Sequence, residues 1–213
     1  MTTSPNTKHT KISVIILIWF SLILALSLNH SFIPAKGELP VNILLSAAIS
    51  VGLFILAYWR LPIFRDYVLN IDMRLLIMLH SWRMLGMGFI MLYLFDKLPP
   101  LFAFLAGFGD AATAIAAVFL AYALFTERQG VSKKLIWRWN TFGLLDFIIA
   151  VSIGILTQTD AVLYASNGVS SDLMVAFPFV LIPGFLVQLF TITHIIIYLQ
   201  LHNNHQEHKF ISI

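Results

Sequence analysis

The stretch Leu101–Phe125, LFAFLAGFGDAATAIAAVFLAYALF, carries a single charged residue, Asp110, in an otherwise apolar run. The run is longer than the ~20 residues that an α-helix needs to cross the hydrocarbon core of a bilayer. A charged side chain at the bilayer centre costs at least ~2.5–3.5 kcal/mol by insertion scales, so such a residue is expected to face the interior of a helical bundle. This stretch therefore predicts a membrane-spanning helix with one buried polar position.

The composition of the whole chain is that of a membrane protein. Of its 213 residues, 59% are hydrophobic and 11% are charged, and the mean hydropathy is +0.88, whereas soluble domains carry about 25% charged residues. The length suits one integral membrane domain covering residues 1–213. Cysteine is absent, which excludes disulfides, Cys-ligated zinc and a thiol nucleophile. No basic, aromatic-interleaved surface indicates nucleic-acid binding.

Six apolar segments predict an all-α, polytopic transmembrane bundle. They are Ile12–Leu28, Val41–Tyr58, Leu75–Phe95, Leu101–Phe125, Leu135–Leu156 and Leu173–Leu201. The first ends near Ala25-Leu26-Ser27, which has the small-x-small pattern of a signal-peptide cleavage site. Its apolar run is long for a signal-peptide core, so we expect the segment to remain as a span.

The basic residues of the connections alternate from one side of the predicted bundle to the other. Lysine and arginine gather before the first span, after the second and after the fourth, at Lys8, Lys11, Arg60, Arg65, Arg74, Arg128, Lys133, Lys134 and Arg138. The connection from Thr157 to Asp172 contains neither residue type. The positive-inside rule then places both termini in the cytoplasm.

Two spans carry stripes of small residues that include their aspartates. The fourth has Ala103, Gly107, Asp110, Ala114, Ala117 and Ala121, and the fifth has Gly143, Asp146, Ala150 and Gly154. This spacing places each stripe on one helical face, and small residues let helices approach closely in a membrane. We therefore expect both aspartates to point into the bundle, with Arg83 of the third span nearby.

These residues and their polar neighbours form the candidate binding site; the sequence predicts no metal there and leaves a catalytic role open. Its members are Arg83, Asp110, Asp146, Asn140, His80, His194 and Gln188. At 1.5 Å per residue, Arg83 and the aspartates fall near the midplane, and His80, His194 and Asn140 lie somewhat nearer the cytoplasm. Because water follows polar walls more easily than apolar ones, we expect any cavity at the site to open toward the cytoplasm or laterally between helices.

Three groups of residues carry a resemblance to a known family. They are Gly107-Phe-Gly109-Asp110, Trp139-Asn140-Thr-Phe-Gly143-Leu-Leu-Asp146, and Phe177-Pro178 with Pro183 and His194. Over about residues 80–194 the chain resembles a family of small polytopic bacterial inner-membrane proteins of uncharacterised function. The resemblance implies a multi-pass protein of the bacterial inner membrane, and it implies no reaction.

Four classes of function fit these residues. The midplane cluster could bind or transport a small solute or relay protons, and transport with only six spans would call for a homo-oligomer. A b-haem or quinone redox protein would use His80 and His194 as axial ligands. A membrane enzyme would use Asp110 or Asp146 as general base on a lipid-like substrate. In a structural or accessory subunit, the buried ion pairs would only fix the packing of the helices.

The loop charges predict the outcome of reporter fusions. Fusions at Gly130 and at the C-terminus should report a cytoplasmic location, and a fusion at Asn167 should report a periplasmic one. A periplasmic C-terminus would contradict this topology.

Overall fold

The computed structural model describes residues 5–35, 37–126, 131–164 and 168–203, and these residues form helices and no strands. The fusion points Gly130 and Asn167 and the end of the chain lie outside them. The α-helices are α1 (Pro5–Leu28), α2 (Val41–Arg60), α3 (Pro62–Leu69), α4 (Met73–Leu79), α5 (Met87–Leu94), α6 (Pro100–Phe125), α7 (Lys133–Leu156) and α8 (Val187–His202). Two 3₁₀ segments, η1 (His80–Gly86) and η2 (Asp172–Val175), and one π-helical turn, η3 (Ile182–Leu186), complete the described helices.

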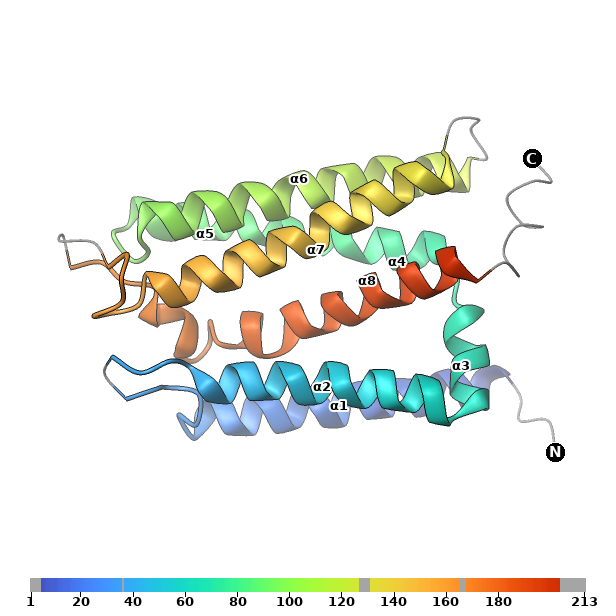
Figure 1. Ribbon diagram of the computed structural model, residues 1–213, viewed down its shortest axis with the longest axis horizontal. Coiled ribbons are helices and arrows are strands. Elements are labelled where there is room, and N and C mark those ends of the chain that lie inside the picture. Colours follow the sequence, from blue (N-terminus) through green and yellow to red (C-terminus); the bar gives the residue numbers. More distant parts are fainter. Residues whose placement is uncertain (1–4, 36, 127–130, 165–167, 204–213) are drawn as a thin grey trace.

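The long helices run back and forth along one axis of the molecule (Figure 1). Among the described residues, five are long and apolar enough to cross a membrane, and the apolar part of α1, Ile12–Leu28, is shorter. The start of α1 and the end of α8 lie at the same end of the bundle as α3, on the right of Figure 1. We call this the α3 end and the opposite one, where η2 lies, the η2 end.

The third long helix is continuous but changes its winding in the middle. Met73–Leu94 comprises α4, the 3₁₀ segment η1 and α5. It begins with a capped turn, because the side chain of Asp72 accepts a hydrogen bond of 2.9 Å from the backbone N–H of Arg74. The connection before it also folds, as the short helix α3 with Pro62 in its first turn, where proline loses no intrahelical hydrogen bond.

The predicted start of the sixth span at Leu173 is wrong. In the structure the apolar helix runs over Ile182–His202, and the residues before it form η2 and turns. Pro178 therefore precedes the helix, and Pro183 lies within the π-turn η3. Proline has no N–H to donate to the preceding turn, so a regular α-helix does not form across these two positions.

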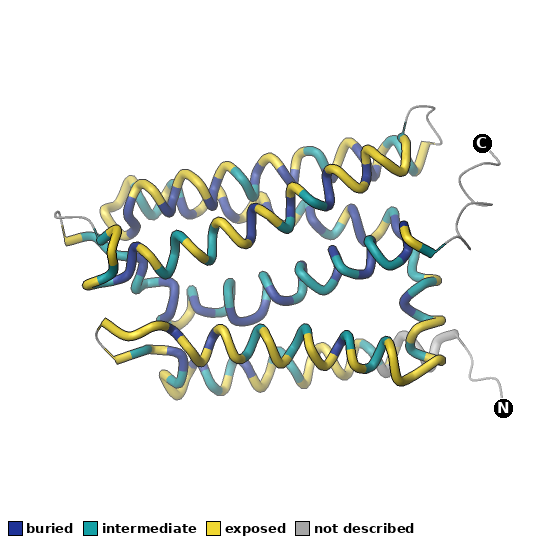
Figure 2. The backbone as a smooth tube through the Cα atoms, viewed as in Figure 1, coloured by how far each residue is buried: buried dark blue, intermediate teal, exposed yellow. Residues whose placement is uncertain are grey.

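Helices α6 and α8 are the most deeply buried of the long helices, whereas α2 is the most exposed of those that could span a membrane. In the most apolar windows of α6 and of the helix ending in α8, 44% of the residues are buried, against 11% for α2. Figure 2 shows the same contrast between the dark α8 and the largely yellow α2. The predicted inward face of α6 is confirmed by the burial of its small residues Ala103, Gly107, Ala114, Ala117 and Ala121.

Two apolar clusters fill the two ends of the bundle and leave a polar layer between them. Ile77, Ile136 and Ile197 are fully buried toward the α3 end. Leu98 and Phe102 are buried toward the η2 end. The candidate site lies between these clusters, where several helices reach their midpoints.

Gln188 of α8 links this helix to α2 by hydrogen bonds. Its Oε1 accepts a 2.7 Å hydrogen bond from Ser50, and its Nε2 donates to Ser46 Oγ at 2.8 Å and to the Pro183 carbonyl at 3.3 Å. The Gln188 side chain is almost completely buried. A buried amide with partners on both of its ends fixes how α2 lies against η3 and α8.

Gln188→Leu should therefore destabilise the protein, because it leaves two serine hydroxyls without this partner. The expected loss is about 1 kcal/mol, a lowering of the melting temperature by a few degrees. Thermal unfolding of the detergent-solubilised protein measures it. Ser152→Ala is the matched control, because Ser152 donates only within its own helix, to Ile148, and should change little.

Candidate functional site

Arg83 lies midway along the helix Met73–Leu94, and its side chain is only 1% exposed. Glycines bring α6 close enough for it to reach Asp110. A Cβ on Gly107 would stand 3.1 Å from the carbonyl oxygen of Gly86, and a Cβ on Gly86 would collide with the carboxyl group of Asp110. The bare backbones at these two positions therefore allow the close approach of η1 and α6.

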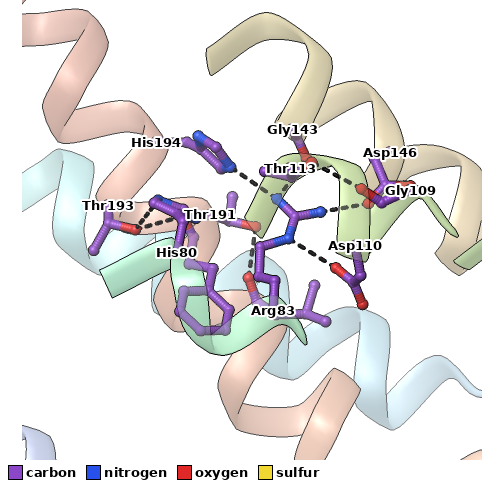
Figure 3. A network of polar contacts seen from close by, with 12 residues as sticks. His80, Arg83, Gly109, Asp110, Thr113, Gly143, Asp146, Thr191, Thr193 and His194 are labelled. Carbon is purple, nitrogen blue, oxygen red and sulfur yellow. Dashed lines mark hydrogen bonds and ion pairs between the residues drawn. The ribbon is translucent and has the colours of Figure 1, made fainter. Parts of the chain in front are cut away.

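The guanidinium of Arg83 joins both aspartates in one ion network (Figure 3). Its Nε donates to Asp110 Oδ1 at 2.7 Å, and its Nη2 donates to Asp146 Oδ2. Its Nη1 donates to the carbonyl of Gly143 and contacts Nε2 of His194, both at 3.1 Å. The face of the guanidinium lies over the ring of Phe147, 3.7 Å from its centroid, a cation–π contact. Three separate helices thus share one buried cation.

The partners of His194 define its tautomer. A guanidinium has only donors, so Nε2 of His194 must accept from Arg83. Its Nδ1 then carries the proton and donates to Asn140 Oδ1 at 2.7 Å. The Nδ2 group of Asn140 donates a 3.0 Å hydrogen bond to the backbone carbonyl of His194. His194 is therefore a neutral acceptor for the arginine, and Asn140 holds it in that orientation.

His80 is the second buried histidine, and it lies against the first. The ring centroids of His80 and His194 are 4.0 Å apart. Thr193 donates its hydroxyl proton to Phe190 O, so it accepts from Nε2 of His80 at 3.0 Å. The other ring nitrogen of His80, Nδ1, is buried without a hydrogen-bond partner among the described residues. His80 is thus also neutral in this arrangement.

The network has an excess of one negative charge if both carboxyls are ionised. Arg83 contributes one positive charge, Asp110 and Asp146 two negative ones, and the histidines none. Their side chains are 1%, 15% and 7% exposed, respectively. A buried uncompensated charge is unfavourable, so the network needs one further proton or cation.

The structure brings six of the seven candidate residues together and separates the seventh. Arg83, Asp110, Asp146, Asn140, His80 and His194 are connected by contacts. Gln188, which shares a helical face with His194 in the sequence, lies with the serines of α2 instead. Sequence reasoning missed Phe147 and Thr193, since a phenylalanine next to an aspartate and a threonine in an apolar helix are ordinary in membrane helices.

The two histidines do not fit the bis-histidine haem alternative. A haem iron with two axial imidazoles needs the rings on opposite faces of a porphyrin. With 4.0 Å between their centroids, the rings of His80 and His194 leave no room for the macrocycle. The ring nitrogens of His194 are also both engaged, by Arg83 and Asn140.

A cavity of about 80 Å³ reaches the network from the η2 end. Ala106 and Asp110 of α6 line it, as do Ala150 and Gly154 of α7. Leu44 of α2 also lines it. Small side chains on two adjacent helices leave this space unfilled. The carboxyl oxygen Asp110 Oδ2 has no hydrogen-bond partner among the described residues.

The cavity therefore does not follow the polar side chains toward the α3 end, and the other expected opening, laterally between helices, stays a prediction. His80, Asn140 and His194 are fully buried. The two histidine rings pack against Trp139, and that of His80 also packs against Phe190. The cavity lies on the side of Arg83 toward the η2 end, and its lining is almost entirely apolar. Space between small residues, and not polarity, determines where the network can be reached.

The described residues form an all-helical protein with five helices that could span a membrane and a buried ion network between them. The chain belongs to the family described as a domain of unknown function (DUF8737), whose model matches residues 40–202. No curated protein matches the chain, and no solved structure does. The matched residues begin just before α2 and contain the entire ion network.

Arg83→Leu should be strongly destabilising, by about 3–5 kcal/mol, because it leaves two buried carboxylates without their cation. The double variant Arg83→Leu, Asp146→Asn should be less destabilised than Arg83→Leu alone. Arg74→Leu is the control, because its ion pair with Asp72 is 43% and 34% exposed and should contribute about 0–1 kcal/mol. Thermal unfolding of the purified variants ranks their stabilities. Equal losses of stability for Arg83→Leu and Arg74→Leu would contradict the ion network.

Gly143→Ala should disrupt the same network from the side of α7. A Cβ there would lie 2.6 Å from Cε1 of His194 and 3.0 Å from Nη1 of Arg83, so one of these side chains must move. We expect a lower melting temperature by several degrees. Gly88→Ala has nothing within 4 Å of the added carbon and should leave the melting temperature unchanged or slightly higher.

Proposed function

We propose that this chain is a multi-pass integral membrane protein that binds, and carries, a small solute at the point where the cavity meets Asp110. It crosses the bacterial inner membrane six times, with α1 as the first crossing and both termini in the cytoplasm. The α3 end is the cytoplasmic end, and the η2 end is the periplasmic one.

One observation carries the binding proposal. Asp110 is a lining residue of the cavity; Arg83 holds its Oδ1, and its Oδ2 has no hydrogen-bond partner among the described residues. Ligand sites are typically apolar cavities with a few fixed polar groups. Asp110 is such a group, since its salt bridge with Arg83 fixes its position.

The topology is supported by charge and by the arrangement of the helices. Lys133, Lys134 and Arg138 lie at the α3 end of α7, and Arg60 lies at the same end of α2. Of the three connections at the η2 end, the one from Thr157 to Asp172 has no lysine or arginine. The other two have one lysine each, Lys36 and Lys97, and each lysine has an acidic residue close to it in the sequence. The start of α1 and the end of α8 share the basic end (Figure 1), as an even number of crossings requires.

A purely structural role for the ion network is the competing proposal. Buried ion pairs hold helices in register, and this network joins η1, α6, α7 and α8. A scaffold, however, has no need of a cavity beside its ion pair. The two proposals differ in whether small molecules reach the side chains next to Asp110.

Cysteine labelling separates them, because the chain has no native cysteine. Ala106 and Ala103 lie one turn apart on α6 and are 1% and 0% exposed, but only Ala106 lines the cavity. In lipid nanodiscs, N-ethylmaleimide should label Ala106→Cys at least tenfold faster than Ala103→Cys. Equally slow labelling of both positions would leave the scaffold as the better account.

A further inference from the structure

We infer that the solute is a lipophilic cation, an apolar body with a protonated amine, which reaches Asp110 from the bilayer through the space between α2 and α7. This inference rests on the proposed function, because it names the class of molecule that the proposed site takes. It is argued from the walls of the cavity, from the charge of the ion network and from the orientation of the two aspartates.

The walls of the cavity suit an apolar body that comes from lipid. Its lining side chains are almost all hydrocarbon, and Asp110 is the charged residue among them. Figure 1 shows α2 and α7 on either side of η3 at this end of the bundle. Leu44 of α2 is exposed, and Val151 and Ile155 of α7 are partly exposed. Side chains that line the cavity are thus at least partly exposed outside the core of the bundle, where a membrane would supply acyl chains.

The charge of the network selects a cation over a neutral or anionic head. Asp110 and Asp146 share a single guanidinium, and the hydrogen-bond roles of the histidines make both neutral. A protonated amine on Asp110 Oδ2 would balance the remaining charge, and it can donate the hydrogen bond that this oxygen does not receive from the described residues. A carboxylate head would add a second uncompensated charge and should be excluded.

The two aspartates are not equivalent, and only Asp110 can meet such a head. Both carboxyl groups lie against a bare glycine backbone, Asp110 against Gly86 and Asp146 against Gly109, so the cavity decides between them. Asp146 is not among the residues that line the cavity, whereas Asp110 is. Asp146 thus contributes only its negative charge to the network, whereas Asp110 accepts the hydrogen bond from the ammonium group.

The same charge count couples binding to a proton. Without a ligand, one carboxyl of the pair must carry a proton to keep the buried network neutral. The titratable groups around Asp110 are Arg83 on η1, Asp146 on α7, and His80 and His194 behind the arginine. The residues that α2, α5 and η3 bring to the cavity are all apolar. When the ammonium group binds, that proton leaves for the aqueous phase, one for each cation bound.

Three probes with the same six-carbon chain test the inference: hexylamine, hexanol and hexanoate. In the Ala106→Cys protein in nanodiscs at neutral pH, where hexylamine is protonated, each probe is added before N-ethylmaleimide. Hexylamine should slow the labelling of the cysteine at a concentration at least tenfold lower than hexanol does. Hexanoate should not slow it. A pH dye in weak buffer should record about one proton released for each hexylamine bound.

Two conservative variants show whether hexylamine binds through the negative charge of the network or through its contact with Asp110. In Asp110→Asn, hexylamine and hexanol should slow labelling equally, and no proton should be released. In Asp146→Asn the carboxyl contact remains but the excess charge is gone, so hexylamine should bind more weakly and release no proton. Labelling without a probe checks that each variant keeps the cavity.

The outcomes distinguish the two proposals. The lipophilic cation would be overturned by any of three results: equal protection by all three probes, protection by none of them, or protection by hexylamine without proton release. In each case, rapid labelling of Ala106→Cys would still support a solute cavity. A cysteine at position 106 that N-ethylmaleimide does not reach would overturn the proposed function itself.

Discussion

The buried guanidinium of Arg83 is the constraint on which the rest of the structure depends. A cation at the centre of an apolar bundle is tolerated only when its hydrogen bonds and its charge are satisfied. Four of its five N–H groups reach Asp110, Asp146, Gly143 and His194, from three helices. These contacts require the helix backbones to lie close together. Glycines stand where η1 approaches α6 and where α7 approaches Arg83 and His194.

Much of the fold could be predicted from the sequence because apolar length and the placement of small residues are local signals. The stripe through Asp110 indicated the buried face of α6, and the aspartates of two spans indicated a shared cation. The start of the last span could not be read in this way. Apolar residues continue from Leu173, and only the missing N–H groups of Pro178 and Pro183 decide that the helix begins later.

The details of the site depended on contacts that a sequence does not show. Gln188 and His194 occupy one helical face by spacing, but they are separated because Gln188 lies nearer the η2 end, where α2 offers two serines. The histidines at matched depth suggested two ligands for one iron, whereas the structure places their tilted rings directly against each other and gives each a hydrogen-bond partner. The orientation of a side chain around its helix axis decides such questions, and it follows from tertiary packing.

The position of the cavity has the same physical origin. Polar side chains in the half toward the α3 end satisfy one another and close the space between helices, as Asn140 and His194 do. In the other half, alanine and glycine on α6 and α7 face each other without filling the gap. The cavity therefore approaches the ion network along its apolar side.

The most direct test of this account is a distance measurement on the protein in lipid bilayers. Solid-state NMR with ¹⁵N-labelled arginine and ¹³C-labelled aspartate can detect contacts between the Arg83 guanidinium and carboxyl carbons, with Asp110→Asn and Asp146→Asn assigning each signal. The account predicts that the guanidinium is in contact with both carboxyl groups at once. Contact with only one of them, or with neither, would contradict it.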